Sequence, residues 1–140
     1  VYRKIDAGKE FYSDPWRISE IFRNLASNAI KYRNESNSQP EVRIEICAGP
    51  RYVEILFRDN GIGIEPKNVT EIFEMFYRAT EQANGSGIGL YIVKNAVEKL
   101  GGNISVESEF GTGTTFTIIL PNLFAELKAK KSAFSEIRKS

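Results

Sequence analysis

The sequence contains no histidine, and its only cysteine is Cys47. The absence of histidine excludes an imidazole base, an imidazole metal ligand and a histidine phosphoacceptor within these 140 residues. A single cysteine excludes an internal disulfide and a cysteine-based metal site. We expect Cys47 to be a packed or edge thiol in a strand. The chemistry of this chain must therefore come from carboxylates, amides, basic side chains and the backbone.

Long apolar runs and an excess of one charge are also missing. No segment approaches the roughly 18 apolar residues of a membrane-spanning helix, and no signal-peptide pattern is present. The 19 basic and 18 acidic residues give a net charge of +1, which does not favour binding to nucleic acid or to a membrane. Because the chain begins with Val1, we interpret it as a fragment whose membrane anchor, if any, lies elsewhere.

Apolar residues at helical spacing predict a helix from Trp16 to about Tyr32. Either Ser13 or Asp14 can cap it, and Pro15 suits its first turn. The residues before it, 1–13, are expected to form two short strands or an extended segment.

One face of this helix is polar, because Asn24, Asn28 and Lys31 follow one another at spacings of four and three. An amide oxygen facing a cleft can bind Mg²⁺, and a lysine can contact phosphate oxygens. Tyr32 can stack beside a base. A solvated polar face is the alternative interpretation of the same pattern.

Two hairpins are predicted by apolar residues that alternate with polar ones. Their strands cover Val42–Cys47 with Arg51–Arg58, and Asn103–Glu109 with Thr114–Leu120. Thr114 begins the last strand, which can lie beside the strand of Asp59 and support its contact with a base. A threonine that serves only strand formation is the alternative.

Asp59-Asn60-Gly61-Ile62-Gly63-Ile64 follows the second strand of the first hairpin. A carboxylate only accepts hydrogen bonds, so Asp59 can bind the amino group of adenine and would repel the carbonyl oxygen of guanine. The glycines allow backbone to approach a ligand. A simple turn is the alternative, because Asp, Asn and Gly dominate turns.

Further motifs follow this loop. We expect a short helix from Glu65 to about Phe73, then an aromatic segment whose Arg78 can grip a terminal phosphate, then a polar flap at 79–87. Gly85–Leu90 opens a helix that ends at Gly101-Gly102, and glycines leading into a helix form an anion site. The basic segment 122–140 is expected to be a solvated tail or linker, within which Ala125–Arg138 can form an amphipathic helix, and a nucleic-acid patch is the alternative.

Taken in order, these motifs resemble the catalytic ATP-binding domain of sensor histidine kinases, within the GHKL superfamily. The resemblance covers residues 1–121, which we expect to be one domain. It implies a bacterial-type, cytoplasmic fragment that is monomeric by itself, because the family dimerises through helices outside this chain. The matching segments are Asn24–Tyr32 (N box), Asp59–Ile64 (first glycine box), Phe73–Arg78 (F box), Gly85–Leu90 (second glycine box) and Gly111–Phe116 (last glycine box). The implied fold is an α+β, two-layer α/β sandwich of the Bergerat type, with about three main helices packed on a mixed five-stranded sheet.

The resemblance also implies the role of each matching residue. Mg²⁺ would be coordinated by Asn28 with help from Asn24, and the catalytic residues would be Asn24 and Arg78. The residues implied to bind ATP are Asn28, Lys31, Tyr32, Asp59, Gly61, Gly63, Ile64, Phe76, Arg78, Gly85, Ser86, Gly87, Ile88, Gly89, Leu90 and Thr114.

One position separates kinases from the related gyrase-type and chaperone ATPases, which carry a glutamate base four residues before the magnesium asparagine. Here that position is Asn24, an amide without useful basicity, although Glu20 lies one turn earlier. We therefore expect transfer of the terminal phosphoryl group to a histidine on a separate dimerisation helix domain of the same protein, which would then serve a response regulator. A pseudokinase, an anti-sigma-type serine kinase and a structural domain without ATP binding are the alternatives.

Overall fold

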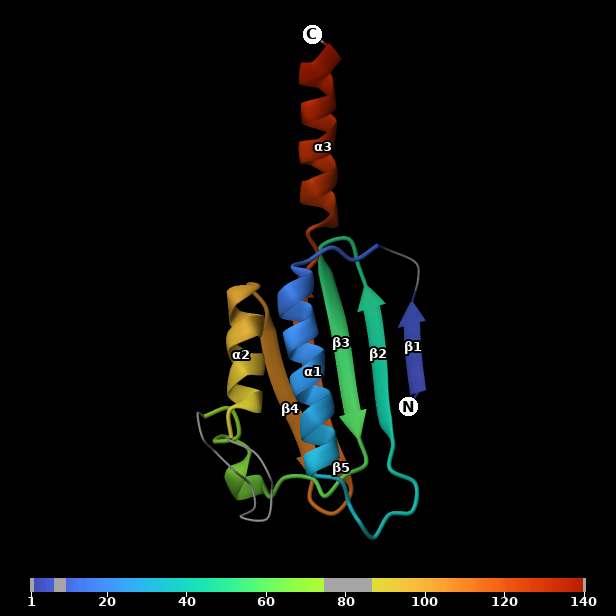
Figure 1. The fold of residues 1–140 in the computed structure, drawn as a ribbon, viewed down its shortest axis with the longest axis vertical. Helices are drawn as coiled ribbons and strands as arrows, with labels where there is room; N and C mark the ends of the chain where they lie inside the picture. Colours follow the sequence, from blue (N-terminus) through green and yellow to red (C-terminus); the bar gives the residue numbers. More distant parts are fainter. Residues whose placement is uncertain (1, 7–9, 75–86, 140) are drawn as a thin grey trace.

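Five strands form one mixed sheet in the order β1-β2-β3-β5-β4 (Figure 1). The structure is a computed structural model that describes residues 2–6, 10–74 and 87–139. The strands are β1 (Tyr2–Asp6), β2 (Val42–Ala48), β3 (Tyr52–Asp59), β4 (Asn103–Glu109) and β5 (Gly113–Pro121). β1 runs parallel to β2, and the other neighbours are antiparallel.

Both predicted hairpins are present, and β5 of the second hairpin pairs with β3 of the first. In this pairing Asp59 lies opposite Thr114, as the sequence predicts. The alternation of β3 buries Val53, Ile55 and Phe57 on a single face. One face of the sheet therefore carries the apolar residues that the helices cover.

Helix α1 (Pro15–Lys31) confirms the first predicted helix. Asp14 is the N-cap, because its Oδ1 accepts a 2.9 Å hydrogen bond from the backbone N–H of Trp16. The helix buries Ile21, Leu25 and Ala29.

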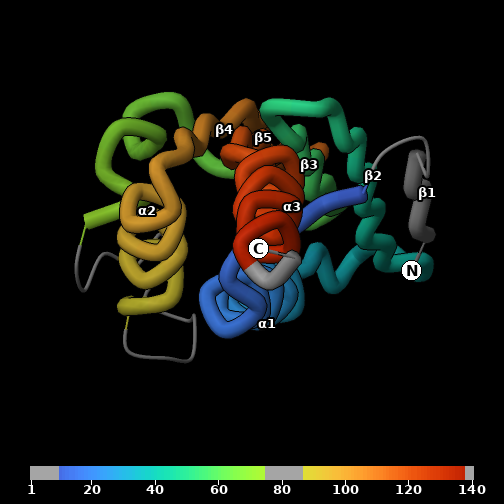
Figure 2. The backbone as a smooth tube through the Cα atoms, turned by 90° about the horizontal axis from the view of Figure 1, so that it is seen from above, coloured from blue at the N-terminus to red at the C-terminus, as the bar shows by residue number. Residues whose placement is uncertain are grey.

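Helix α2 (Gly89–Lys99) lies beside α1, and the two helices cover the same face of the sheet (Figures 1 and 2). It buries Val93, Ala96 and Val97. Gly101 has φ +77° and the N–H of Gly102 donates to the carbonyl of Val97 at 2.9 Å, so the predicted glycine C-terminus is confirmed. The core therefore lies between these two helices and the sheet, as expected for a two-layer sandwich.

Two local expectations, for residues 65–73 and for Cys47, differ from the structure. The helix expected from Glu65 to about Phe73 is a single 3₁₀ turn, η1 (Pro66–Asn68), followed by further turns. Helix α3 (Phe124–Lys139) agrees with the helix that the sequence allows over Ala125–Arg138, and it extends beyond the sheet rather than packing on it (Figure 1). Cys47 is exposed, although β2 lies between β1 and β3.

No helix in the described parts of the chain is long and apolar enough to cross a membrane.

The start of α3 is fixed to the segment that enters α1. Asn122 is only 5% exposed, and its Nδ2 donates to the carbonyls of Glu10 (2.7 Å) and Gly49 (2.8 Å). Its Oδ1 accepts from the backbone N–H groups of Tyr12 and Phe124, both at 3.1 Å. The rings of Tyr12 and Phe124 also stack, with centroids 5.3 Å apart. One buried amide therefore joins the entry segment, the β2–β3 turn and α3.

Candidate functional site

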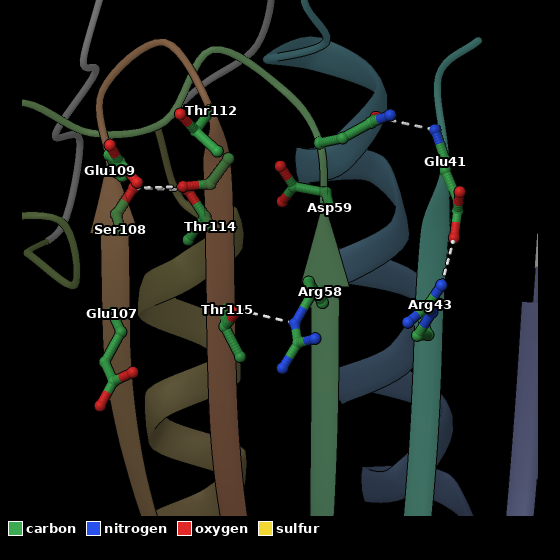
Figure 3. A pocket seen from close by; sticks show the side chains of 12 residues that line it. Glu41, Arg43, Arg58, Asp59, Glu107, Ser108, Glu109, Thr112, Thr114 and Thr115 are labelled. Atoms are coloured by element: carbon green, nitrogen blue, oxygen red, sulfur yellow. Dashed lines mark hydrogen bonds and ion pairs between the residues drawn. The ribbon is translucent and has the colours of Figure 1, made fainter.

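A row of three polar side chains crosses β3, β5 and β4 at one end of the sheet. Asp59 lies opposite Thr114, and Thr114 lies opposite Ser108 on its other side (Figure 3). The next row inward consists of Phe57 and Phe116, each 1% exposed, with Val106. Polar groups therefore begin where the apolar core ends.

The carboxyl group of Asp59 is partly desolvated. Burial raises its pKa above the usual 3.8, and hydrogen bonds from the backbone N–H groups of Gly61 and Thr114 oppose this rise. The bond from Gly61 to Oδ1 measures 2.9 Å. An acceptor held in place by two backbone donors is suited to receive an N–H group from a ligand.

The loop after Asp59 is attached to the C-terminal end of α1. The N–H of Ile62 donates to the carbonyl of Tyr32 at 2.9 Å, and Tyr32 is the C-cap residue of α1. A Cβ on Gly61 would collide with that same carbonyl oxygen. Gly61 is therefore required by the close approach of two protein segments.

The same loop is attached to the β4–β5 turn on its other side. Gly63 has φ +74°, and a Cβ there would collide with the carbonyl of Glu109. The N–H of Gly111 donates to the carbonyl of Ile62 at 2.6 Å. The loop thus has features of both interpretations, the structural turn and the ligand contact. Its glycines allow tight packing of backbone on backbone, and Asp59 remains in the polar row.

Ser108 was not identified from the sequence, yet its hydroxyl makes three contacts. Its Oγ accepts from the N–H of Ile64 at 2.8 Å, donates to the carbonyl of Gly113 at 2.9 Å and lies 2.8 Å from Oγ1 of Thr114. The sequence pattern does indicate its position, because Ser108 falls at the same alternation as Ile104 and Val106, on the inward side of β4. A polar residue on an otherwise apolar face is the pattern to look for.

Asn24 on α1 faces the beginning of α2. Its Nδ2 donates to the carbonyl of Glu20 at 2.8 Å, and its Oδ1 lies 3.5 Å from the position that a Cβ on Gly89 would take. The amide therefore offers its oxygen, not its nitrogen, to the space between the two helices. On the same α1 face, Asn28 is half-buried and Lys31 is exposed.

The second glycine box leads into α2 as the sequence predicts. Gly87 has φ +74°, and Ile88 is an N-cap residue without a side-chain hydrogen bond to the helix. The first N–H groups of α2 are thus without a side-chain cap, so the helix end is suited to an anion. Of the other predicted ATP-binding residues, Phe76, Arg78, Gly85 and Ser86 lie outside the described residues.

An open cavity of about 510 Å³ lies at the end of the sheet that carries the polar row (Figure 3). It includes Asp59, Ser108 and Thr114, together with Arg43 and Arg58, which lie opposite each other on β2 and β3. Its lining does not include the α1 residues. The structure thus brings the predicted residues together in two groups, one around Asp59 and one around Asn24, which the bond between Tyr32 and Ile62 connects.

Within the described residues no cluster of His, Cys, Asp or Glu side chains is suited to hold a metal ion. The amide oxygens of Asn24 and Asn28 on α1 are uncharged metal ligands. A magnesium ion at this place would therefore depend on oxygens from its ligand's phosphates, which is the usual manner in which Mg²⁺ binds with nucleotides.

Comparison with known proteins agrees with this geometry. The model of the family described as "Histidine kinase-, DNA gyrase B-, and HSP90-like ATPase" matches residues 13–123. The autoinducer 2 sensor kinase/phosphatase LuxQ of Vibrio parahaemolyticus is 35% identical over 127 residues, covering 86% of this chain and 15% of that protein. The methanogenesis regulatory histidine kinase FilI of Methanothrix harundinacea is 40% identical over 110 residues, covering 77% and 12%.

A solved structure shares the fold. Full-length ShkA in complex with AMPPNP superposes with a TM-score of 0.73 at 27% identity, over 86% of this chain and 25% of that chain. The chain thus spans only a small part of each of these relatives. The family match covers most of this chain, and together with the polar row and the asparagine face it settles the assignment: the chain belongs to the histidine kinase-, DNA gyrase B- and HSP90-like ATPase family, as an ATP-binding domain of the histidine kinase type.

Proposed function

We propose that this domain binds Mg-ATP and transfers the terminal phosphoryl group to a histidine on a separate dimerisation domain of the same sensor kinase. The observation that carries the proposal is the pairing of Asp59 with Thr114 at the end of the core, fixed to the asparagine helix through Tyr32 and Ile62. The similarity to ShkA, solved with AMPPNP, supports it. In this proposal residues 1–121 form the catalytic domain and 122–140 a linker.

The adenine would bind at the polar row. Asp59 offers acceptor oxygens in a partly desolvated position, so an amino N–H of the base would replace the hydration that the carboxylate lacks. A purine with a carbonyl oxygen at the same place would meet repulsion between two acceptors. Tyr32 would flank the ring, because its position at the end of α1 places it next to the first glycine box.

The phosphates would lie between α1 and the first turn of α2. The uncapped N–H groups around Gly89 and the charge of Lys31 would bind phosphate oxygens. The amide oxygens of Asn28 and Asn24 would hold Mg²⁺, which supplies charge neutralisation at the phosphates when bound. Arg78, outside the described residues, would contact the terminal phosphate.

The chemistry of the α1 face favours transfer over hydrolysis. A water molecule near the terminal phosphate would need a base, and Asn24 is an amide whose nitrogen is already bonded to the carbonyl of Glu20. A neutral imidazole nitrogen needs no base, because its lone pair attacks phosphorus directly. The bond from phosphorus to the bridging oxygen then breaks and ADP leaves. A response regulator would next receive the phosphoryl group.

The test is phosphotransfer in the full-length protein with labelled ATP and Mg²⁺. We expect a label that is stable in base and lost in acid, as phosphohistidine is, and we expect Asn28→Asp to abolish it. Ser19→Ala, an exposed change on another face of α1, is the matched control and should retain the label. Nucleotide binding without such a label would exclude the transferase proposal, and absence of nucleotide binding would exclude the ATP site.

A further inference from the structure

The hydroxyl of Ser108 has one proton and two lone pairs. The carbonyl of Gly113 can only accept, so the 2.9 Å contact uses the proton of Ser108. The backbone N–H of Ile64 can only donate, so the 2.8 Å contact uses one lone pair. A single lone pair of Ser108 remains for its neighbour Thr114.

The one proton and two lone pairs of Ser108 determine the direction of the third hydrogen bond. Oγ of Ser108 and Oγ1 of Thr114 are 2.8 Å apart, a distance at which either atom can donate. All three bonds exist together only if Thr114 is the donor. The hydroxyl proton of Thr114 is then directed toward Ser108 on β4, so that toward any other group Thr114 can only accept a hydrogen bond.

Burial makes this arrangement the favoured one. Thr114 is only 6% exposed, and Ser108 is half-buried, so water does not freely replace a missing bond. If the Thr114 proton turned away while the Ser108 proton stays on the carbonyl of Gly113, the two hydroxyl oxygens would face each other at 2.8 Å with no hydrogen between them and would repel each other. The satisfied network is therefore the one in which Thr114 acts on the ligand side as an acceptor.

We propose that Ser108 is a positioning residue that fixes the hydroxyl direction of Thr114, so that Thr114 and Asp59 present two adjacent acceptors to the base. This inference rests on the proposed binding of ATP. Two acceptors side by side select a group that carries two N–H bonds, and the 6-amino group of adenine is such a group. A 6-oxo purine has no hydrogen at that atom.

The network also fixes the loop that carries the first glycine box. Ile64 follows Gly63, and its N–H is held by the same Ser108 oxygen that receives the Thr114 proton. Ser108 thus holds both the loop and the hydroxyl, and an experiment must separate a loss of loop structure from a loss of hydroxyl direction.

The experiment measures the dissociation constants of ATP and inosine triphosphate, both with Mg²⁺. The constant for inosine triphosphate divided by that for ATP gives the preference for ATP. The wild-type protein should bind ATP much more tightly. In Ser108→Ala the Thr114 hydroxyl is free to turn and donate to the 6-oxo group, so the preference for ATP should fall at least about fivefold, the effect of one hydrogen bond. Ser108→Thr keeps the hydroxyl and should restore the preference.

Two further variants make the test specific. In a Thr114→Val background, Ser108→Ala should leave the ratio unchanged, because the hydroxyl through which it acts is gone. Ser105→Ala removes an exposed hydroxyl from the same strand and should not alter the ratio. Equal weakening of both nucleotides by Ser108→Ala would overturn the inference, since a merely structural role predicts that result. If the wild-type protein binds neither nucleotide, the proposed function fails and this inference falls with it.

Discussion

The carbonyl oxygen of Tyr32, at the C-terminal end of α1, accepts a 2.9 Å hydrogen bond from the N–H of Ile62 in the loop after β3. This bond connects the asparagine-bearing helix with the loop that follows Asp59, two elements separated by a complete hairpin in the sequence. The close approach explains the glycine at position 61, because any side chain there would meet the same carbonyl. The position of the residues around Asn24 relative to those around Asp59 thus depends on backbone contacts.

Gly63→Ala should destabilise the domain more than Gly111→Ala. Both glycines have positive φ, which costs about 1–2 kcal/mol for a residue with a Cβ. A Cβ at Gly63 would also collide with the carbonyl of Glu109, whereas no atom lies within 4 Å of one at Gly111. We expect the free energies of unfolding to differ by at least about 1 kcal/mol, as overpacking does. Urea denaturation of the two variants checks this, and equal losses would contradict the packing argument.

Asp59→Asn should weaken ATP binding while making the fold less sensitive to pH. Burial raises the pKa of Asp59 above 3.8, so between 3.8 and that raised value the native state holds more protons than the unfolded state. The wild-type free energy of unfolding therefore loses the contribution of this group as the pH rises through the native pKa. The neutral amide of Asn lacks this penalty.

Denaturation from pH 3.8 to neutral pH provides the measurement. The stability of Asp59→Asn relative to wild type should increase over that range. A constant difference at all pH values would show that the carboxyl is not desolvated. Glu54→Gln, which removes an exposed carboxyl from the same strand, is the matched control variant.

Asn122→Ala should cost about 3 kcal/mol of stability, because it removes four partly buried hydrogen bonds to backbone groups at once. Asn103→Ala, at an exposed position on β4, should change the unfolding free energy by less than about 0.5 kcal/mol. Thermal unfolding of both variants tests this expectation. A small effect at Asn122 would mean that solvent satisfies the released groups.

Asp14→Ala should lower the free energy of unfolding by about 1 kcal/mol through loss of the N-cap, while Asp14→Asn should retain it within a few tenths. Ser13→Ala should have little effect, because the cap bond comes from Asp14. The three variants compared by urea denaturation distinguish the two caps that the sequence left open. A larger loss at Ser13 would contradict the assignment.

Periodicity predicted most of the framework. The helical spacing around Leu25 and the alternation around Phe57 each reflect burial on one face, which is why α1 and the hairpins were placed correctly. The pairing of Asp59 with Thr114 also followed from one strand that ends at this edge and another that begins there. These features depend on local pattern, and local pattern is visible in a sequence.

Features that depend on long-range contacts were missed. Ser108 is important through its bonds to Ile64 and Thr114, and the first of these lies 44 positions away. Segment 65–73 contains apolar Val69, Ile72 and Phe73 at helical spacing, yet after η1 it forms only turns, since packing on the core decides its shape. Asn122 was placed in a tail, although its amide joins three segments.

Helix α3 extends from the end of the domain opposite the polar row, and Asn122 holds its first turn (Figure 1). Sixteen residues at about 1.5 Å each make it about 24 Å long. A fluorophore or surface linker attached near its far end would therefore stand well away from the cavity around Asp59. The domain can thus be immobilised as a nucleotide sensor with its recognition edge facing the solution.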